Sequence, residues 1–267
     1  MPGGRVAVRK SAPGMPGQLA AEAAGLRWLA EPGAVPVAAV LGLDDEHILV
    51  EYLPSASPDR AAAERFGAGL ARLHAAGADA FGVPPPGGPS DAWIGTTGMR
   101  NEPGTDWPTW YVEQRVLPYL RAGRDAGSVT AEEAAEVEAA CRALPEVAGP
   151  PVPPARLHGD LWSGNVCWSA GPEGSAGPVD AWLIDPAAHG GHPETDLAML
   201  ALFGCPHLDA VLAGYRRVTP LGDGWADRVG LHQLFPLLVH VVLFGRGYTS
   251  QALAAARSTT RLLDGIP

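Results

Sequence analysis

The chain has 267 residues, of which 46% are hydrophobic and 18% charged, a balance typical of a globular protein rather than a disordered one. Its formal net charge is −10 and it has no clustered basic stretch, which argues against a nucleic-acid-binding protein. The three cysteines are widely separated, and we recognise neither a signal-peptide core nor an apolar run long enough to cross a bilayer. We therefore expect a cytoplasmic protein with no nucleic-acid or membrane partner.

Residues 1–54 predict a small antiparallel sheet with one helix. Residues 18–30 repeat apolar side chains at helical spacing, and the flanking runs are typical of strands. The expected strands cover 5–10, 37–43 and 47–53. Pro54 ends the last of them, so we expect an N-terminal lobe that finishes here.

Residues 55–267 predict a larger, mainly helical lobe. The expected helices cover 59–76, 107–122, 130–144, 193–203, 208–218 and most of 225–263. Short apolar runs bounded by turn residues lie at 155–158, 166–168 and 181–184. The segment 81–108 is rich in glycine and proline and predicts a long, ordered loop. The fold class expected from this pattern is α/β (α+β) with two lobes.

The strongest functional signal is the order of three polar residues in the second lobe. Asp160 and Asn165 stand five residues apart in a tight, glycine-containing loop, and Asp185 follows Asn165 by twenty residues. Each alone would be an ordinary turn residue. Phosphoryl transfer to a hydroxyl, however, needs a carboxylate that accepts the proton and hard oxygen ligands for magnesium. Because the three residues supply both in the right order, they predict the catalytic half of a kinase-type site.

Two longer stretches surround these residues, HGDLWSGN at 158–165 and IDPAAHGGHPETDLAML at 184–200. With AAEAAGLRWLAEPGAVPV, LARLHAAG and DWPTWYVEQRVLPYL, they make the sequence resemble the fructosamine kinase (ketosamine 3-kinase) family over nearly its whole length. That family is related to aminoglycoside and choline phosphotransferases and has the protein-kinase-like fold. The tryptophan after HGDL separates it from the aminoglycoside enzymes. The resemblance implies a two-lobed kinase-like fold.

The resemblance also implies roles in catalysis. Asp160 would be the general base, and Asn165 and Asp185 would bind Mg²⁺ that bridges the phosphates of ATP. His158 would orient the loop by hydrogen bonding. Apart from the resemblance, Trp162 stands between the base and the metal ligand, and this position in the loop makes it a candidate contact of the acceptor sugar.

Further roles follow for residues outside the loop. Glu22 matches the glutamate that pairs with a strand lysine. The segment Glu51-Tyr52-Leu53 would be the hinge whose backbone meets adenine. Asp196 would support the catalytic loop from a helix start, and Asp196 and His189 are candidate acceptor contacts.

The phosphate anchor is Arg9 or Lys10. The family's strand reads VFVK, and here the same place reads Val6-Ala7-Val8-Arg9-Lys10. In an unbulged strand, Lys10 shares a face with the valines and Arg9 shares the other face with Ala7. Valines ordinarily face an interior, and a small Ala7 suits a position beneath adenine, so Arg9 is favoured. A bulge would bring Lys10 into place instead.

Two other features carry expectations. Before the anchor strand the family has a strand, a glycine- and serine-containing loop and another strand, whereas this sequence has only Met1–Gly4. We therefore expect a truncated N-terminal lobe without the phosphate-covering loop. His189 and His192, with Asp185 and Glu194 nearby, suggest a metal cluster, but their spacing fits no zinc motif and favours a polar loop near the acceptor.

The resemblance implies an acceptor of the ketosamine type, in which a sugar is attached through a carbon-1 amine to a small molecule or to a glycated protein. Phosphorylation at the sugar 3-hydroxyl, with ATP and Mg²⁺ as cofactors, would make the adduct labile and reverse glycation. We expect a monomer. Two alternatives stay open: a kinase of the same fold acting on an aminoglycoside, choline or homoserine, and a catalytically impaired nucleotide-binding homologue.

Overall fold

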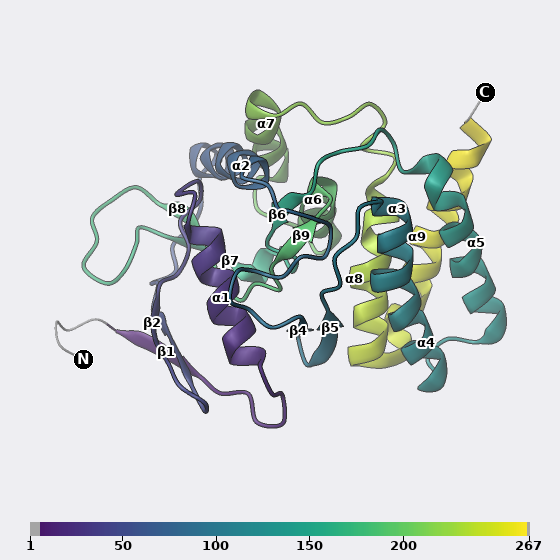
Figure 1. The fold of residues 1–267 in the computed structure, drawn as a ribbon. Helices are drawn as coiled ribbons and strands as arrows, with labels where there is room; N and C mark the ends of the chain where they lie inside the picture. Colours follow the sequence, from purple (N-terminus) through teal and green to yellow (C-terminus); the bar gives the residue numbers. More distant parts are fainter. Residues whose placement is uncertain (1–5, 266–267) are drawn as a thin grey trace.

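The computed structural model describes residues 6–265, which form a small sheet at one end and a block of helices at the other (Figure 1). Short strands joined by loops lie between the two ends. The expected combination of a small antiparallel sheet with a larger helical part is confirmed. The expectation about Met1–Gly4 and the phosphate-covering loop lies outside the described residues.

The N-terminal sheet has three antiparallel strands in the order β1-β3-β2. They are β1 (Ala7–Lys10), β2 (Val40–Leu43) and β3 (Ile48–Glu51), each inside an expected range. Helix α1 (Gln18–Ala30) packs on the sheet, and a small core joins its Leu19 and Leu26 to Ile48 and Val50 of β3.

The segment between α1 and β2 ties this sheet to the rest of the chain. The backbone N–H of Ala38 donates to the carbonyl of Leu183 at 3.1 Å, and the N–H of Leu183 donates to the carbonyl of Pro36 at 2.9 Å. Trp28 and Leu29 at the end of α1 share a buried core with the later helices. The predicted division into residues 1–54 and 55–267 stays a prediction.

Two pairs of short strands carry the motifs singled out above. Strand β6 (Ala155–Leu157) pairs with β9 (His189–Gly191), and β7 (Val166–Ser169) pairs with β8 (Asp180–Leu183). The loop between β6 and β7 therefore lies beside the loop between β8 and β9. Strand β9 was not expected, because its three residues give no readable period.

Residues 81–108 are not one long loop, so that prediction was wrong. They contain a hairpin of β4 (Asp91–Ile94) and β5 (Thr97–Arg100). The hairpin is held to the start of α1, since the indole N–H of Trp93 donates to the Pro16 carbonyl at 3.0 Å and Gln18 Nε2 donates to the Gly95 carbonyl at 3.2 Å. Four-residue strands within a glycine- and proline-rich segment are too short to show a clear alternation.

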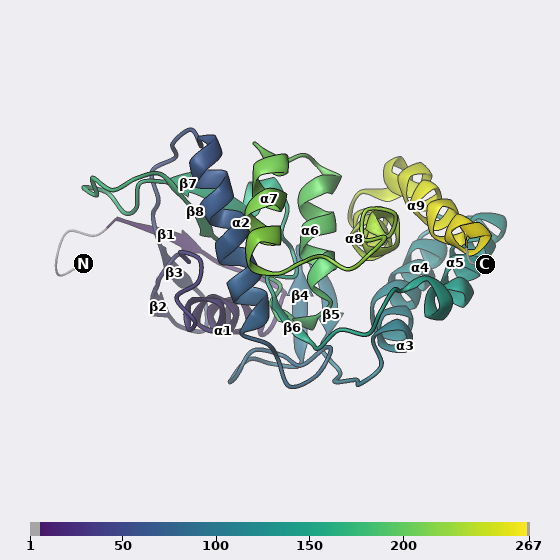
Figure 2. The same cartoon turned by 90° about the horizontal axis from the view of Figure 1, so that it is seen from above.

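The helices that follow the N-terminal sheet pack in two groups, which share α8 and α9. These helices are α2 (Arg60–Ala75), α3 (Trp107–Tyr111), α4 (Leu117–Asp125), α5 (Ala131–Val147), α6 (Pro193–Leu202), α7 (Leu208–Val218), α8 (Val229–Phe244) and α9 (Thr249–Arg261). Seen from above, α2, α7, α6, α8 and α9 follow one another across the molecule (Figure 2). Helices α2 and α7 touch closely, because a Cβ at Gly67 would lie 1.8 Å from the Val211 carbonyl oxygen. Helices α3, α4, α5, α8 and α9 enclose the largest core.

The run Val229–Gly265 is apolar and long enough to cross a membrane by composition alone, but half of its most apolar window is buried. It bends after Phe244, and α8 and α9 then pack on each other. The side chains of Leu234 and Leu238 are fully buried in the largest core. We therefore assign most of α8 to the protein interior.

Candidate active site

A cavity of about 400 Å³ lies where α1, the β4–β5 hairpin, the β6–β7 loop and α8 meet. Five charged or polar side chains that the sequence singled out line it: Lys10, Glu22, Asp160, Asn165 and Asp185. We call these five the catalytic cluster. Three separate regions of the sequence supply them, and the fold brings them together, with Lys10 in the place for which the sequence favoured Arg9.

The loop that carries Asp160 requires glycine at the preceding position. Gly159 has φ +80°, and a Cβ there would lie 2.1 Å from the Ala187 carbonyl oxygen. Any other residue would strain the backbone and collide with the opposite loop. The close approach of the two loops sets the position of Asp160 relative to Asp185.

Asp196, in the first turn of α6, holds this loop from below. Its carboxylate accepts hydrogen bonds from the backbone N–H groups of His158 (2.8 Å) and Gly159 (3.0 Å), and lies 3.3 Å from His74 Nε2. Burial alone would raise the pKa of Asp196, but these partners hold it below its usual value. The predicted loop support is thus present. Asp196 is 1% exposed and does not line the cavity, so it is not placed to touch an acceptor.

His158 connects the two loops. Its Nε2–H donates to the Ile184 carbonyl at 2.9 Å, because a carbonyl can only accept. Nδ1 is then free to accept from the backbone N–H of Asp160 at 3.3 Å. Burial lowers the pKa of His158, so the ring stays neutral and orients the loop, as expected, rather than moving protons.

Asp160 is held by Asn165 and has a raised pKa. Asn165 Nδ2 donates to Asp160 Oδ2 at 2.9 Å and to the Asp160 carbonyl at 2.8 Å. Burial, with a smaller contribution from the charge of Asp196, raises the pKa of Asp160 to about 6, although the bond from Asn165 opposes the shift. A carboxylate with this pKa is a stronger base than a solvated one and is still ionised at neutral pH.

Asp185 follows β8 with φ +53°, a left-handed conformation that a residue other than glycine seldom adopts. Its side chain is 46% exposed and forms an ion pair with Lys10. Asn165 makes its hydrogen bonds through Nδ2, which leaves Oδ1 available. Asp185 and Asn165 therefore offer the hard oxygen donors that Mg²⁺ prefers.

Lys10, rather than Arg9, pairs with Glu22, so the preference for Arg9 was wrong. Lys10 Nζ lies 2.8 Å from Glu22 Oε1. Strand β1 pairs with β3 without a bulge and sets Lys10 opposite Ile48. The two faces were correctly separated, but Lys10 is the residue of this strand that lines the cavity, and Arg9 does not line it. Val8 is 39% exposed, so an apolar residue here did not mark a closed interior.

The expected hinge lies at the end of β3 and outside the lining of the cavity. The Glu51 N–H donates to the Ala39 carbonyl at 2.9 Å, and the Tyr52 N–H donates to the Val6 carbonyl at 3.2 Å. Tyr52 is exposed and Leu53 is buried. A contact between these residues and adenine stays a prediction.

Trp162 lines the cavity next to Asp160, whereas His189 does not. A Cβ at Gly164 would lie 2.1 Å from the Trp162 ring, so the glycine gives the indole its place. His189 is 2% exposed, its Nδ1–H donates to the Ala187 carbonyl, and burial lowers its pKa to about 3. The expectation that His189 sits in a polar loop at the acceptor is therefore wrong: it is a buried strand residue.

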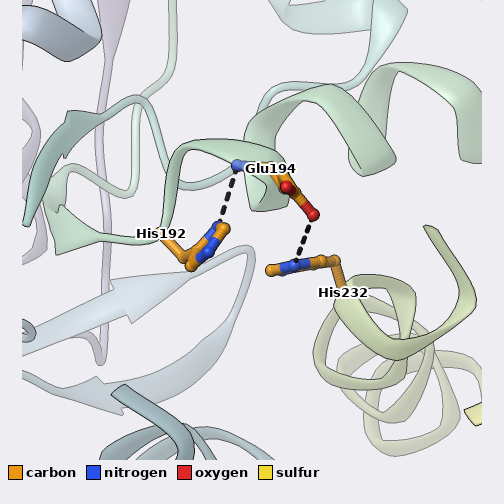
Figure 3. A group of neighbouring side chains, drawn as sticks. All are labelled: His192, Glu194 and His232. Atoms are coloured by element: carbon orange, nitrogen blue, oxygen red, sulfur yellow. Dashed lines mark hydrogen bonds and ion pairs between the residues drawn. The ribbon is translucent and has the colours of Figure 1, made fainter. Parts of the chain in front are cut away.

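A second polar cluster, which we call the Glu194 cluster, forms where α6 begins and α8 passes (Figure 3). It consists of His192, Glu194, Arg228 and His232, all buried. Arg228 donates to both carboxylate oxygens of Glu194, at 3.0 and 2.6 Å. His232 Nε2 lies 3.3 Å from Glu194 Oε2 at an ion-pair distance without hydrogen-bond alignment. The sequence suggested His192 and Glu194 but missed His232, forty residues further on.

Three groups of this cluster lie close enough to hold a metal ion, within 4.8 Å of one another. Their protonation argues against it. His192 Nδ1 accepts the Glu194 backbone N–H at 3.2 Å, so the neutral ring carries its proton on Nε2. Both Glu194 oxygens are already bound by Arg228. We interpret the cluster as a buried structural ion pair between Arg228 and Glu194, with the two histidines packed beside it.

The sequence missed the contribution of α8 to the cavity. His240 and Phe244 line it together with Trp93 of the hairpin. The long C-terminal helix was read as core packing, and most of it is. Aromatic residues that break the apolar stripe near its end were the available signal.

Comparisons with known proteins agree with this geometry. The sequence model of the fructosamine kinase family matches residues 3–261. A probable ketoamine kinase of Enterococcus faecium is 32% identical, with 86% of this chain and 79% of the relative covered. The chloroplastic protein-ribulosamine 3-kinase of Arabidopsis thaliana is 31% identical, with 93% and 74% covered.

Solved structures show the same relationship. A crystal structure assigned as a fructosamine-3-kinase of Thermobifida fusca is 46% identical, has a TM-score of 0.88, and matches over 97% of this chain and 86% of that one. More distant matches, an aminoglycoside phosphotransferase and a choline kinase, have TM-scores of 0.58 and 0.61 and show the protein-kinase-like fold. This chain is therefore a phosphotransferase that belongs to the fructosamine kinase family.

Proposed function

We propose that this protein transfers the γ-phosphoryl group of ATP to the 3-hydroxyl of a ketosamine. The observation that carries the proposal is the environment of Asp160, a half-buried carboxylate at the cavity wall whose pKa is raised to about 6 and whose orientation Asn165 fixes. Such a group is suited to accept a hydroxyl proton at neutral pH.

Lys10 and Glu22 would hold the nucleotide. A lysine paired with a glutamate is pre-positioned, and its ammonium can bind the α- and β-phosphates as a compact charge. The backbone of Glu51, Tyr52 and Leu53 would meet the adenine, with the nucleotide lying between the parts 1–54 and 55–267.

Asn165 and Asp185 would hold Mg²⁺. Their free oxygens are of the right chemistry, and the ion would supply positive charge that screens the phosphate oxygens during transfer. In the described structure, Lys10 fills part of this space through its ion pair with Asp185. When ATP is bound, the Lys10 ammonium could donate to the phosphate oxygens instead of to Asp185.

The chemical step conserves its atoms. The 3-hydroxyl oxygen forms a bond to the γ-phosphorus, and the bond from that phosphorus to the bridging oxygen breaks, so that ADP leaves. Asp160 takes the hydroxyl proton. His158 and Asp196 do not react but keep the loop in place. Positioning and charge neutralisation supply most of the rate enhancement in this class of reaction.

The acceptor class follows from the relatives' names, which are ketoamine kinase and protein-ribulosamine 3-kinase. A ketosamine on a small amine or on a protein lysine is the corresponding acceptor here. Its 3-phosphate is labile, so the proposed role is removal of glycation adducts, performed by a cytoplasmic monomer.

The test is ³¹P NMR of the protein with ATP, Mg²⁺ and the fructose adduct of propylamine. We expect a new phosphomonoester signal coupled to the sugar H3 proton, and with Asp160→Asn a signal that grows at least about a hundredfold more slowly. Phosphorylation of choline or an aminoglycoside in place of the adduct would contradict the acceptor class. Tight Mg²⁺–ATP binding without turnover of any acceptor would contradict catalysis itself.

A further inference from the structure

Aromatic side chains gather at the mouth of the cavity. Among the described residues, every tryptophan or phenylalanine that is well exposed lies here: Trp162 is 39% exposed, Phe203 37% and Phe244 63%. His240 and Tyr248 lie between them. We call these five residues the aromatic rim. Soluble proteins seldom leave several large aromatic side chains together in water without a binding role.

The five rings form one continuous surface. Phe203 lies 4.8 Å from His240 and 6.4 Å from Trp162, measured between ring centroids. Tyr248 lies 4.9 Å from His240 and 5.8 Å from Phe244. The residues come from the catalytic loop, the end of α6, the end of α8 and the turn after it, so no single helix face accounts for them.

The aromatic rim is continuous with the catalytic cluster. Trp162, His240 and Phe244 line the same cavity as Asp160, whereas Phe203 and Tyr248 extend the surface outside it. An acceptor whose hydroxyl reaches Asp160 would therefore leave its remaining atoms against these rings.

The rim and the cavity differ in charge. None of the five rim residues has a permanent charge, and burial lowers the pKa of His240, so its imidazole is neutral. His240 Nδ1–H donates to the Pro236 carbonyl at 2.7 Å, which leaves Nε2 as an acceptor. A neutral aromatic surface attracts cations through the ring faces and does not repel them.

We propose that the aromatic rim binds the amine side of the ketosamine, with the protonated amine against the rings and an uncharged apolar carrier over Phe244. This inference rests on the proposed function and adds to it the class of amine preferred. The amine is joined to carbon 1, close to the 3-hydroxyl, so it lies next to Trp162 when that hydroxyl meets Asp160.

The aromatic rim also predicts which kind of carrier group on the amine is preferred. An apolar carrier would gain by covering the exposed ring of Phe244, whereas a carboxylate placed there would lose water without gaining a partner. Fructose adducts of 3-methylbutylamine and of β-alanine have the same sugar and the same two-carbon spacer on the amine, and they differ in that an uncharged CH(CH3)2 group replaces a carboxylate of similar size. They are a matched pair for this question.

The experiment measures kcat/KM of the wild type for both adducts, and then of Phe244→Ala, Phe244→Leu and Val218→Ala. Val218 is exposed on α7, outside the cavity, and serves as the control. We expect Phe244→Ala to lower kcat/KM for the apolar adduct about three- to tenfold and to change the other less. Phe244→Leu, which keeps apolar area but removes the ring, should lie between.

The outcomes separate the two proposals. If the wild type phosphorylates both adducts but their ratio is the same in Phe244→Ala, the rim inference is wrong and the proposed function stands. If the wild type phosphorylates neither, both are wrong. A change of oligomeric state in Phe244→Ala, seen by sedimentation with an unchanged ratio, would assign the rim to contact between copies of the chain instead.

Discussion

The catalytic cluster and the Glu194 cluster contain similar kinds of side chain but differ in what they leave open. In the Glu194 cluster, Arg228 occupies both carboxylate oxygens and no group faces the cavity. In the catalytic cluster, Asn165 Oδ1 and the Asp185 carboxylate can still accept a ligand, and all five members line the cavity. Oxygen atoms that are free to bind a ligand at a cavity, rather than burial alone, single out the catalytic cluster as the candidate site.

Shifted pKa values do not make this distinction. Burial raises the pKa of Asp160 to about 6, whereas Arg228 and His232 outweigh burial and lower the pKa of Glu194 to about 2. Both are large departures, but only Asp160 lines the candidate active-site cavity. A perturbed pKa needs an accessible cavity before it indicates function.

The first prediction concerns the base in the catalytic cluster. Asp160→Asn keeps the shape of the side chain but cannot accept a proton, so kcat should fall about a hundredfold to ten-thousandfold. The melting temperature should stay close to that of the wild type. Steady-state kinetics and a thermal melt check both parts, and a near-wild-type kcat would remove Asp160 from this role.

The second prediction concerns the Glu194 cluster. Glu194→Ala leaves the Arg228 charge buried and unpaired, so the free energy of unfolding should fall by about 3–5 kcal/mol, while kcat of the folded protein changes little. Urea denaturation gives the first quantity. Glu136→Ala removes a comparable two-bond contact with Arg257 on the surface and should have little effect on unfolding. If both variants lose the same free energy of unfolding, burial does not make the loss of the Arg228–Glu194 ion pair more costly, and the prediction is wrong.

The third prediction tests the corrected choice of Lys10, rather than Arg9, as the phosphate anchor. Lys10→Ala should raise the Kd for ATP about 10- to 150-fold, because losing a charged partner of phosphate costs roughly 1.5–3 kcal/mol. Arg9→Ala should leave it nearly unchanged, since Arg9 is on the opposite, exposed face. Calorimetric titration measures both, and a larger effect of Arg9→Ala would restore Arg9 as the phosphate anchor that the sequence favoured.

The fourth prediction concerns pH. Asp160 must be ionised to accept a proton, and its pKa is raised to about 6. Activity is therefore lost as pH falls through that value, and kcat/KM should drop about tenfold for each pH unit below it and level off above it. A pH profile at saturating Mg²⁺–ATP measures this, and a profile that stays flat down to pH 4.5 would mean that burial does not control the base.

The sequence predicted the local parts of the site well. Asp160, Asn165 and Asp185 lie on two short loops whose glycine and strand neighbours are close in the chain, so spacing alone placed them. Glu22 was placed by the resemblance. These residues share the cavity as expected.

The sequence could not predict features that depend on which face of a strand is buried or on contacts between residues far apart in the chain. The choice between Arg9 and Lys10 failed because valine was taken as a mark of the interior, whereas Val8 on β1 and Val6 just before it are exposed. The β4–β5 hairpin was too short to show a period. The partnership of His232 with Glu194 and the gathering of the aromatic rim join residues far apart in the chain, and only the fold brings them together.

One measurement tests the central claim that the catalytic cluster, and not the Glu194 cluster, binds the metal–nucleotide complex. ATP is titrated calorimetrically into the wild type, Asp185→Ala and Glu194→Gln, each with and without Mg²⁺, after thermal melts confirm that all three are folded. We predict that Mg²⁺ tightens ATP binding in the wild type and in Glu194→Gln but not in Asp185→Ala. An unchanged magnesium effect in Asp185→Ala, or its loss in Glu194→Gln alone, would contradict the account.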